Sequence, residues 1–263
     1  MKSYINDSIR RVLGLEDLSP SPNVNEVFNQ LVSNVIESSD FDIELISPGD
    51  RHRVRKLAAE AEFKLENFWA QQIITSDDPI SMLAKFPYAD NYGELVHREM
   101  MLIEESGLQL NEFHSVLIIG SGPLPYTAIE INRRSAATVD SVDSSYEAIQ
   151  LCEQVGRALK INSNYFVSPG QNVRPDRQYN LILVAALAGT DLEEKQDIVT
   201  NVIPFLAEGG RIVLRSARGI RRLLYPAFNP FDLLGVTLLE EYHPTDCIIN
   251  SVLVYQVTHM KAP

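Results

Sequence analysis

The sequence feature that most constrains the fold is a change of hydrophobic period at His114. Before this point apolar residues recur every three or four positions, whereas residues 115–120 (SVLIIG) form a nearly continuous apolar run that ends in glycine. Such a run is typical of a strand that is buried on both faces, as in a parallel sheet. The period therefore predicts a helical segment followed by a sheet.

Runs of both kinds alternate along the rest of the chain. Strand-like runs occupy residues 137–142, 181–186, 211–214 and 249–257, and helical patterns occupy 146–159 and 193–206. This alternation is typical of a mostly parallel sheet with helices on both faces. The second half is therefore predicted to be of the α/β class, with a doubly wound, Rossmann-type sheet.

The residues before the first strand show helical spacing. The pattern predicts helices over 24–36, 54–73 and 91–105, and a shorter helix after the cap sequence 76–79. We therefore expect two domains, an N-terminal helical bundle over residues 1–112 and the sheet domain over residues 113–263.

Composition narrows the class of ligand. The 263 residues include 23 basic and 35 acidic side chains, and the net charge of −12 argues against binding to nucleic acid or to anionic membranes. Cys152 and Cys247 lack metal-ligand spacing, so no metal site is expected. Because no apolar run approaches the roughly 20 residues that cross a bilayer and no signal peptide is recognisable, we expect a cytoplasmic protein that binds small molecules.

The glycines after the first strand point to a nucleoside ligand. In Gly120-Ser121-Gly122-Pro123-Leu124-Pro125 the missing Cβ atoms let the backbone approach a ligand closely. Asp143 follows at the end of the second strand, where its carboxylate can accept hydrogen bonds from both ribose hydroxyls of an adenosine group. Because position 125 is proline where a dinucleotide fingerprint has glycine, S-adenosylmethionine (SAM) is favoured over NAD, in a methyltransferase-like sheet. The alternative is a simple tight turn, with Asp143 capping the next helix.

Several other residues are expected near this ligand. The strand-like run 181–186 leads into the small residues of 184–189, over which the ligand can lie. The segment 167–172 is on the adenine side but lacks an acidic residue. The expected SAM-binding set is Gly120, Ser121, Gly122, Pro123, Leu124, Asp143, Ser144, Asn172, Ala185 and Leu187.

Arg215 ends a predicted strand on the ligand side of the sheet. Its planar guanidinium suits a carboxylate in bidentate fashion. The alternative is a surface cluster with Arg221 and Arg222 that pairs with nearby acids. Glu66, from its position on a helix, is by spacing alone a solvated flank residue, and the loop 86–92 gathers aromatic and polar groups.

Six sequence blocks resemble nicotianamine synthase, in order along the chain. They are FPYADNY (86–92), GSGPLP (120–125), LRSARG (214–219), LYP (224–226), HPTD (243–246) and INSV (249–252). The resemblance spans about residues 62–255. It is strongest to the short bacterial nicotianamine-like synthases that make opine metallophores such as staphylopine, pseudopaline and yersinopine.

The resemblance implies transfer of the 3-amino-3-carboxypropyl (aminobutyrate) group of SAM to an amine, with release of methylthioadenosine. SAM is then a co-substrate, and no metal is required by the protein. Matched by motif position, Glu66 would orient and deprotonate the acceptor amine and Tyr92 would assist by a hydrogen bond. Tyr88 and Arg215 are the candidates for holding substrate carboxylates, and the helical bundle would carry the acceptor site and close over it.

The acceptor is expected to be histidine, because the chain is short, and the alternative is a nicotianamine synthase proper that condenses several aminobutyrate units. The resemblance also leads us to expect a downstream opine dehydrogenase, and a homodimer is a further hypothesis. An ordinary methyltransferase and a non-catalytic SAM sensor are the readings from other classes.

Overall fold

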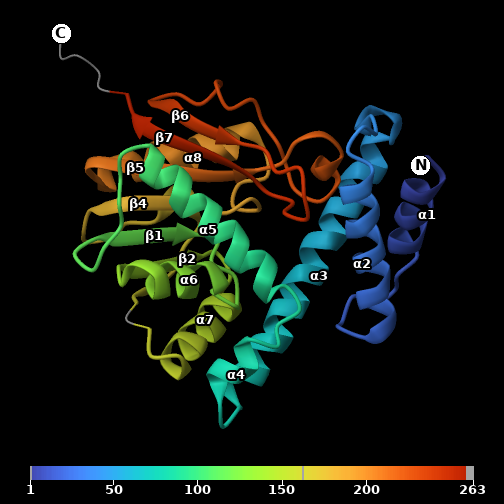
Figure 1. Cartoon of the computed structure of the whole chain (residues 1–263), viewed down its shortest axis with the longest axis horizontal. Coiled ribbons are helices and arrows are strands. Elements are labelled where there is room, and N and C mark those ends of the chain that lie inside the picture. The colour runs from blue at the N-terminus through green and yellow to red at the C-terminus, as the bar shows by residue number, and fades with distance from the viewer. Residues whose placement is uncertain (1, 162, 259–263) are drawn as a thin grey trace.

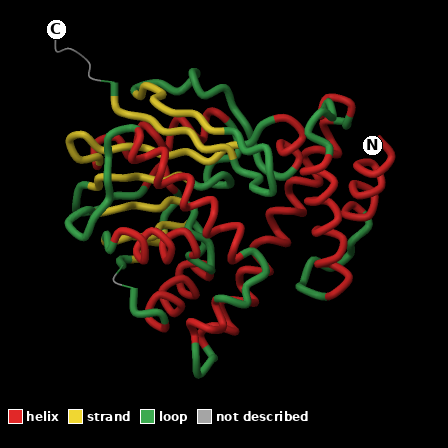
Figure 2. Tube along the Cα trace, viewed as in Figure 1, coloured by secondary structure: helices red, strands yellow, loops and turns green. Residues whose placement is uncertain are grey.

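The structure is a computed structural model that describes residues 2–161 and 163–258. Its helices lie beside and across a central sheet (Figure 1, Figure 2). The helices before the sheet are α1 (Lys2–Leu13), α2 (Pro22–Glu37), α3 (Pro48–Ile74), α4 (Pro79–Leu83) and α5 (Ala89–Glu105). The later ones are α6 (Tyr126–Ser135), α7 (Tyr146–Ala158) and α8 (Leu192–Val202), with short 3-10 turns η1 (Ile43–Leu45), η2 (Gly170–Asn172), η3 (Ile203–Phe205) and η4 (Gly219–Leu223).

The strands form one sheet in the order β3-β2-β1-β4-β5-β7-β6. They are β1 (Ser115–Ile119), β2 (Thr138–Asp143), β3 (Tyr165–Val167), β4 (Tyr179–Val184), β5 (Leu206–Ser216), β6 (Val236–Tyr242) and β7 (Ser251–Val257). Neighbours from β3 to β5 pair in parallel, and β7 runs antiparallel to β5 and β6. The order turns back beside β1, between β1 and β4, which is where ligands bind in open α/β sheets. The predicted doubly wound α/β sheet is confirmed.

Proline and serine set the starts of the long N-terminal helices. Ser21 accepts a hydrogen bond from the backbone N–H of Val24, and Ser47 accepts one from that of Asp50, with proline next in each case. From Ser47, α3 continues for 27 residues. It contacts α1 of the N-terminal helices at one place and α7 of the sheet domain at another. This single helix therefore joins the two halves of the molecule.

Three elements, α1, β3 and β6, were not predicted from the sequence. Strand β3 is only three residues long, and its side chains are half-buried or exposed. Helix α1 buries only one narrow stripe, which includes Ile5, Ile9 and Val12, within an otherwise charged sequence. Strand β6 (VTLLEEY) lies at the edge of the sheet and is largely half-exposed, so it lacks the apolar run that marks a buried strand.

Packing crosses the expected domain boundary in both directions. Helix α5 lies on the sheet, where Leu95 and Ile103 share a core with Val116 and Val254. Conversely, residues 220–224 contribute to the core formed by α1, α2 and the start of α3. The division at residue 112 stays a prediction about folding units, whereas the contacts join the halves into continuous cores.

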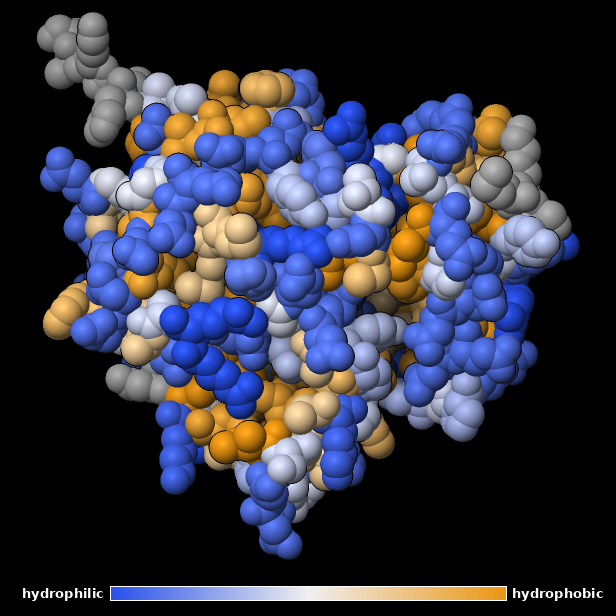
Figure 3. Space-filling view, in the orientation of Figure 1, coloured by the Kyte–Doolittle hydropathy of each residue, from blue (hydrophilic) through white to orange (hydrophobic). Residues whose placement is uncertain are grey.

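The outer surface is mainly polar on the side shown in Figure 3. Hydrophilic residues cover most of the face in view (Figure 3). Within the described residues, no helix is both long and apolar enough to cross a membrane.

A buried ion pair ties α5 to the sheet. Arg215 Nε and Nη2 donate to the two carboxylate oxygens of Glu99 at 2.6 and 2.9 Å, and Nη2 also donates to Thr127 Oγ1 at 3.0 Å. The side chains of Arg215 and Glu99 are only 7% and 1% exposed. Removing one partner would leave the other charge buried without compensation.

We expect Glu99→Ala to lower the free energy of unfolding by about 3–5 kcal/mol, because Arg215 would keep its charge in a dry site. Urea denaturation measures this change. The matched control is Glu153→Ala, which breaks a solvent-exposed pair with Arg157 and should cost less than about 1 kcal/mol. Equal losses in the two variants would contradict the importance of burial.

Candidate functional site

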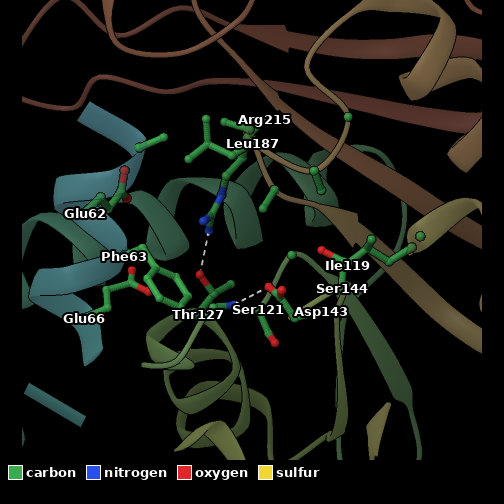
Figure 4. Close-up of a pocket in the computed structure, with 18 of the residues that line it drawn as sticks. Glu62, Phe63, Glu66, Ile119, Ser121, Thr127, Asp143, Ser144, Leu187 and Arg215 are labelled. Atoms are coloured by element: carbon green, nitrogen blue, oxygen red, sulfur yellow. Dashed lines mark hydrogen bonds between the residues drawn. The ribbon is translucent and has the colours of Figure 1, made fainter. Parts of the chain in front are cut away.

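A cavity of about 400 Å³ opens at the carboxyl ends of β1, β2 and β4, between the sheet and α3. Figure 4 shows Glu62, Phe63 and Glu66 projecting from α3 toward Thr127, and Arg215 reaching in from β5. Several further lining residues come from the sheet side, including Gly120, Ser121, Gly122, Pro123, Leu124, Asp143, Ser144, Ala185 and Leu187. Most of the expected SAM-binding set is therefore brought together around one space.

Two close contacts require glycine in the turn after β1. Gly120 has φ +82°, and a Cβ there would lie 2.9 Å from Ala188 Cβ. Gly122 has φ +66°, and a Cβ there would lie 2.5 Å from Glu66 Oε2. The backbone N–H of Gly122 also donates to Asp143 Oδ2 at 3.0 Å. A short stretch of backbone thus brings one carboxylate from the helical half next to another from the sheet.

Asp143 faces the cavity and does not cap the next helix. Its Oδ1 accepts from the backbone N–H of Ser145 at 2.9 Å. The cap of α7 is Ser145, whose side chain accepts from Ala148 N. The alternative of a capping aspartate is therefore wrong, and the carboxylate is held at the cavity wall by two backbone amides.

Two glutamates one helical turn apart share a tyrosine. The hydroxyl of Tyr92 on α5 lies 3.0 Å from Glu62 Oε1 and 3.0 Å from Glu66 Oε1. The hydroxyl of Tyr225 lies 3.1 and 3.0 Å from the two oxygens of Glu62. Spacing alone predicts a solvated Glu66, and this is wrong because α3 faces the cavity at this point.

Burial governs the protonation of this group. Desolvation raises the pKa of Glu66 well above its usual range, and the neighbouring charge of Glu62 raises it further. The pKa of Glu62 is also raised by burial, although the hydroxyls of Tyr225 and Tyr92 oppose the change. Burial, together with the nearby carboxylates, raises the pKa of Tyr92 as well. The site therefore favours at least one protonated carboxyl next to neutral phenols.

Aromatic packing fixes the position of the Tyr92 ring. Its centroid lies 6.1 Å from that of Phe86 and 5.5 Å from that of Tyr126. The loop before α5 thus does bring aromatic and polar groups to the site. Tyr88, from the same loop, donates to Asn29 Oδ1 at 3.2 Å and lines a different space.

That second space is a smaller cavity of about 130 Å³ on the bundle side. It meets the first at five shared residues, which are Glu62, Glu66, Tyr92, Tyr225 and Asn250. The rest of its wall is mainly apolar and includes Val24, Phe28, Leu65, Phe86, Leu95, Leu224 and Ile249. Among the described residues, no lysine, arginine or histidine lines it. The two carboxyls thus lie at the junction of a larger polar cavity and a smaller apolar one.

The structure excludes one of the two interpretations of Arg215. It is buried, so the surface-cluster alternative is wrong. Two of its three nitrogens already bind Glu99. It does line the larger cavity, and its role in holding a substrate carboxylate stays a prediction that now depends on the remaining nitrogen, Nη1.

One expected residue does not join the site. Asn172 is exposed at the end of η2 and does not line either cavity, whereas Gly170 and Gln171 line the larger one. A Cβ at Gly170 would lie 2.6 Å from Ile119 Cγ2, so this turn packs directly against the end of β1. Of Gln171 and Asn172, the two polar side chains expected to face the ligand from this segment, only Gln171 lines the larger cavity.

Sequence reasoning missed three residues that shape the site. Glu62 could have been found one turn before Glu66, and Tyr225 lies in the LYP block. Lys195 gave no signal, because its position in α8 is that of an ordinary helical lysine. Its buried ammonium donates to the carbonyls of Ala185 and Ala188, which fixes the loop beneath the larger cavity, and burial lowers its pKa to about 7.

No metal centre is evident in the part of the chain that the structure describes, since no three histidine, cysteine or acidic side chains are placed to share an ion. A partly buried carboxyl that has a raised pKa and lines a cavity, as Glu66 does, can act as a general base.

The family model and the most similar sequences are both those of nicotianamine synthases. Residues 3–261 match the family model described as nicotianamine synthase protein. Nicotianamine synthase 3 of Arabidopsis thaliana is 34% identical over 267 residues, which cover 95% of this chain and 81% of the relative.

Solved structures share the fold. That of MtNAS in complex with MTA and tNA superposes with a TM-score of 0.82 at 22% identity and covers 98% of both chains. A mutant of MtNAS in complex with S-adenosylmethionine gives a TM-score of 0.80 at 21% identity over 97% of each chain. An S-adenosylmethionine-dependent methyltransferase from Clostridium acetobutylicum gives 0.50 at 11% identity over 66% of this chain and 93% of that one.

The contact between Gly122 and Glu66 predicts the effect of a single methyl group. Gly122→Ala should lower stability by more than the roughly 1–2 kcal/mol that a left-handed backbone costs. The new Cβ would push Glu66 Oε2 aside and disturb the contact of this carboxyl with the Tyr92 hydroxyl. Gly209→Ala is the matched control, since Gly209 has φ +74° and nothing within 4 Å of its added Cβ. Urea denaturation of both variants separates the collision from backbone strain, and equal losses would contradict the contact.

The raised pKa of Glu66 predicts a pH dependence of stability. The folded state keeps a proton that the unfolded state loses near the ordinary value of 4.5, so stability falls as the pH rises from there toward the folded pKa. Glu66→Gln removes this penalty, and its stability relative to the native chain should increase with pH over that window. Chemical denaturation at a series of pH values measures the difference. Parallel curves for the two proteins would contradict a raised pKa.

Proposed function

The chain belongs to the nicotianamine synthase family, and from that premise we propose that it transfers the 3-amino-3-carboxypropyl group of SAM to an amine and releases methylthioadenosine. The observation that carries the proposal is the junction of the two cavities at Glu62, Glu66 and Tyr92. A base at such a junction can contact a donor on one side and an acceptor on the other. The same geometry would have no evident purpose in a SAM sensor.

SAM is assigned to the larger cavity. The ribose hydroxyls of SAM would approach Asp143, and the backbone of the glycine turn would lie against the ligand. Gly170 and Gln171 are placed to border the adenine, and the loop fixed by Lys195 lies beneath the ligand. The aminobutyrate arm then extends toward Glu66 and the smaller cavity.

The reaction is a displacement at the γ-carbon of the methionine arm. The sulfonium activates all three carbons attached to it, so selection depends on which carbon is in line with the acceptor nitrogen. As the nitrogen lone pair forms the new N–C bond, the C–S bond breaks and its electron pair neutralises the sulfur. Glu66 takes the proton that the nitrogen must lose, and Tyr92 holds the carboxyl in position. An ordinary methyltransferase would present the methyl carbon instead.

Two acceptors are considered. The match to plant nicotianamine synthases supports condensation of several aminobutyrate units, as in nicotianamine synthesis. The smaller cavity supports a single, compact acceptor such as histidine, because its volume is about 130 Å³ and its described lining offers no basic side chain for several carboxylates. In the histidine case an opine dehydrogenase would act on the product. A cytoplasmic location and a homodimer belong to the same proposal.

Incubation of the protein with SAM and candidate amines should release methylthioadenosine. Glu66→Gln should reduce its rate of formation by roughly 10²–10⁴-fold, the usual contribution of a general base, while SAM binding by calorimetry persists. Glu60→Gln, an exposed substitution on the same helix, is the matched control and should keep the native rate. Release of S-adenosylhomocysteine, or of neither product with any amine, would overturn the proposal.

Mass spectrometry of the same reactions distinguishes the acceptors. A product formed from SAM alone that contains more than one aminobutyrate unit supports nicotianamine synthesis. A product that appears only with histidine and carries one unit supports the metallophore reaction.

A further inference from the structure

The Tyr92 hydroxyl cannot form both of its hydrogen bonds if the two neighbouring glutamates are ionised. A phenol has one proton to donate, yet carboxyl oxygens of Glu62 and Glu66 lie at 3.0 Å on either side of Tyr92 Oη. One contact is satisfied by the phenol as donor. The other is satisfied only if a carboxyl proton is donated back to the phenol oxygen, since two lone pairs at this distance repel.

The surrounding charges also disfavour two carboxylates. Arg215 is the cation that lines the larger cavity beside them, and its charge is already balanced by Glu99. The other groups that face the pair are neutral phenols, from Tyr88, Tyr92 and Tyr225, and the carboxylate of Asp143 across the turn. A pair of like charges in such a site is relieved by binding one proton.

The two carboxyls are not equivalent. Glu62 receives two phenol contacts, from Tyr225 and Tyr92, and the charge of Arg215 also favours its ionised form. Glu66 receives one phenol contact, from Tyr92, and a backbone contact from Leu124. Phenol donors stabilise a carboxylate, so the shared proton rests on Glu66 and the negative charge on Glu62. In this resting form Glu66 cannot act as a base.

We propose that Glu62 is a second catalytic carboxyl, which shares one proton with Glu66 through Tyr92 and takes that proton when the acceptor amine arrives. The catalytic part of this inference rests on the proposed function, whereas the sharing of the proton does not. Glu62 lines both cavities, so it also contacts the space where the amine would bind.

The proton shift balances without any further reactant. Glu66 gives its proton to Tyr92 Oη as Tyr92 gives its own to Glu62, which leaves the phenol neutral and the total charge unchanged. Glu66, now a carboxylate, accepts the proton of the amine as the N–C bond forms and the C–S bond breaks. The pair then holds two protons and returns one to solvent after the products leave.

Infrared spectroscopy of the full chain without substrate tests the shared proton, because a protonated carboxyl has a C=O stretch distinct from that of a carboxylate. At neutral pH the native protein should show one such band assigned to this pair. Glu62→Gln and Glu66→Gln should each abolish it, since an amide in one position mimics the protonated partner and leaves the other carboxyl ionised. Glu60→Gln should leave the band in place.

Other outcomes overturn the inference. Loss of the band in only one of the two variants would mean that one glutamate holds its proton independently. No band in the native protein would mean that both are ionised. Glu62→Asp and Glu66→Asp keep a carboxyl and should retain the band, which provides a test should either amide variant fail to fold.

The spectra and the activity separate the two proposals. A shared band without formation of methylthioadenosine would refute the proposed function and leave the proton pair in place. Formation of methylthioadenosine by a protein whose spectra show no shared band would refute the pair and leave the proposed function in place.

Discussion

The close approach of the Gly122 backbone to the Glu66 carboxylate is the contact on which the site depends. A side chain at position 122 would fill the space that Glu66 occupies, and Gly122 N–H at the same time fixes Asp143. Helix α3 reaches this point only because it continues from the bundle across the sheet. The absence of a side chain at Gly122 therefore leaves room for a carboxyl from the other half of the chain beside the end of β1.

The buried charges around this contact are arranged in a definite order. Glu99 on α5 binds Arg215 on β5 in bidentate fashion, so the charge of Arg215 is balanced by that of Glu99. Glu62 and Glu66 are consequently left with phenols as their main partners. Were Arg215 free to pair with them, their pKa values would fall toward the ordinary range. The structural ion pair thus helps to keep the pKa values of both carboxyls raised.

The sheet and its ligand-binding edge could be predicted from sequence, because each rests on a local pattern. A buried strand, a glycine turn and an acid at the next strand end are all read within about thirty residues. The roles of Glu62 and Tyr225 could not be read in this way, because their contact joins positions 163 residues apart. Asn172 failed for a related reason, since the direction of each side chain in η2 is set by packing of Gly170 on Ile119.

The helical half was predicted as a separate bundle. It positions residues of the site, however, because its helices share hydrophobic cores with the sheet. Helix α5 is held on the sheet by apolar contacts, and Tyr92 near its start is held by Phe86 and Tyr126. A lid that moved as a rigid bundle would break these contacts together with the Tyr92 bridge. The geometry is better suited to a site that is preformed between the two halves than to one that is assembled when the helical half closes.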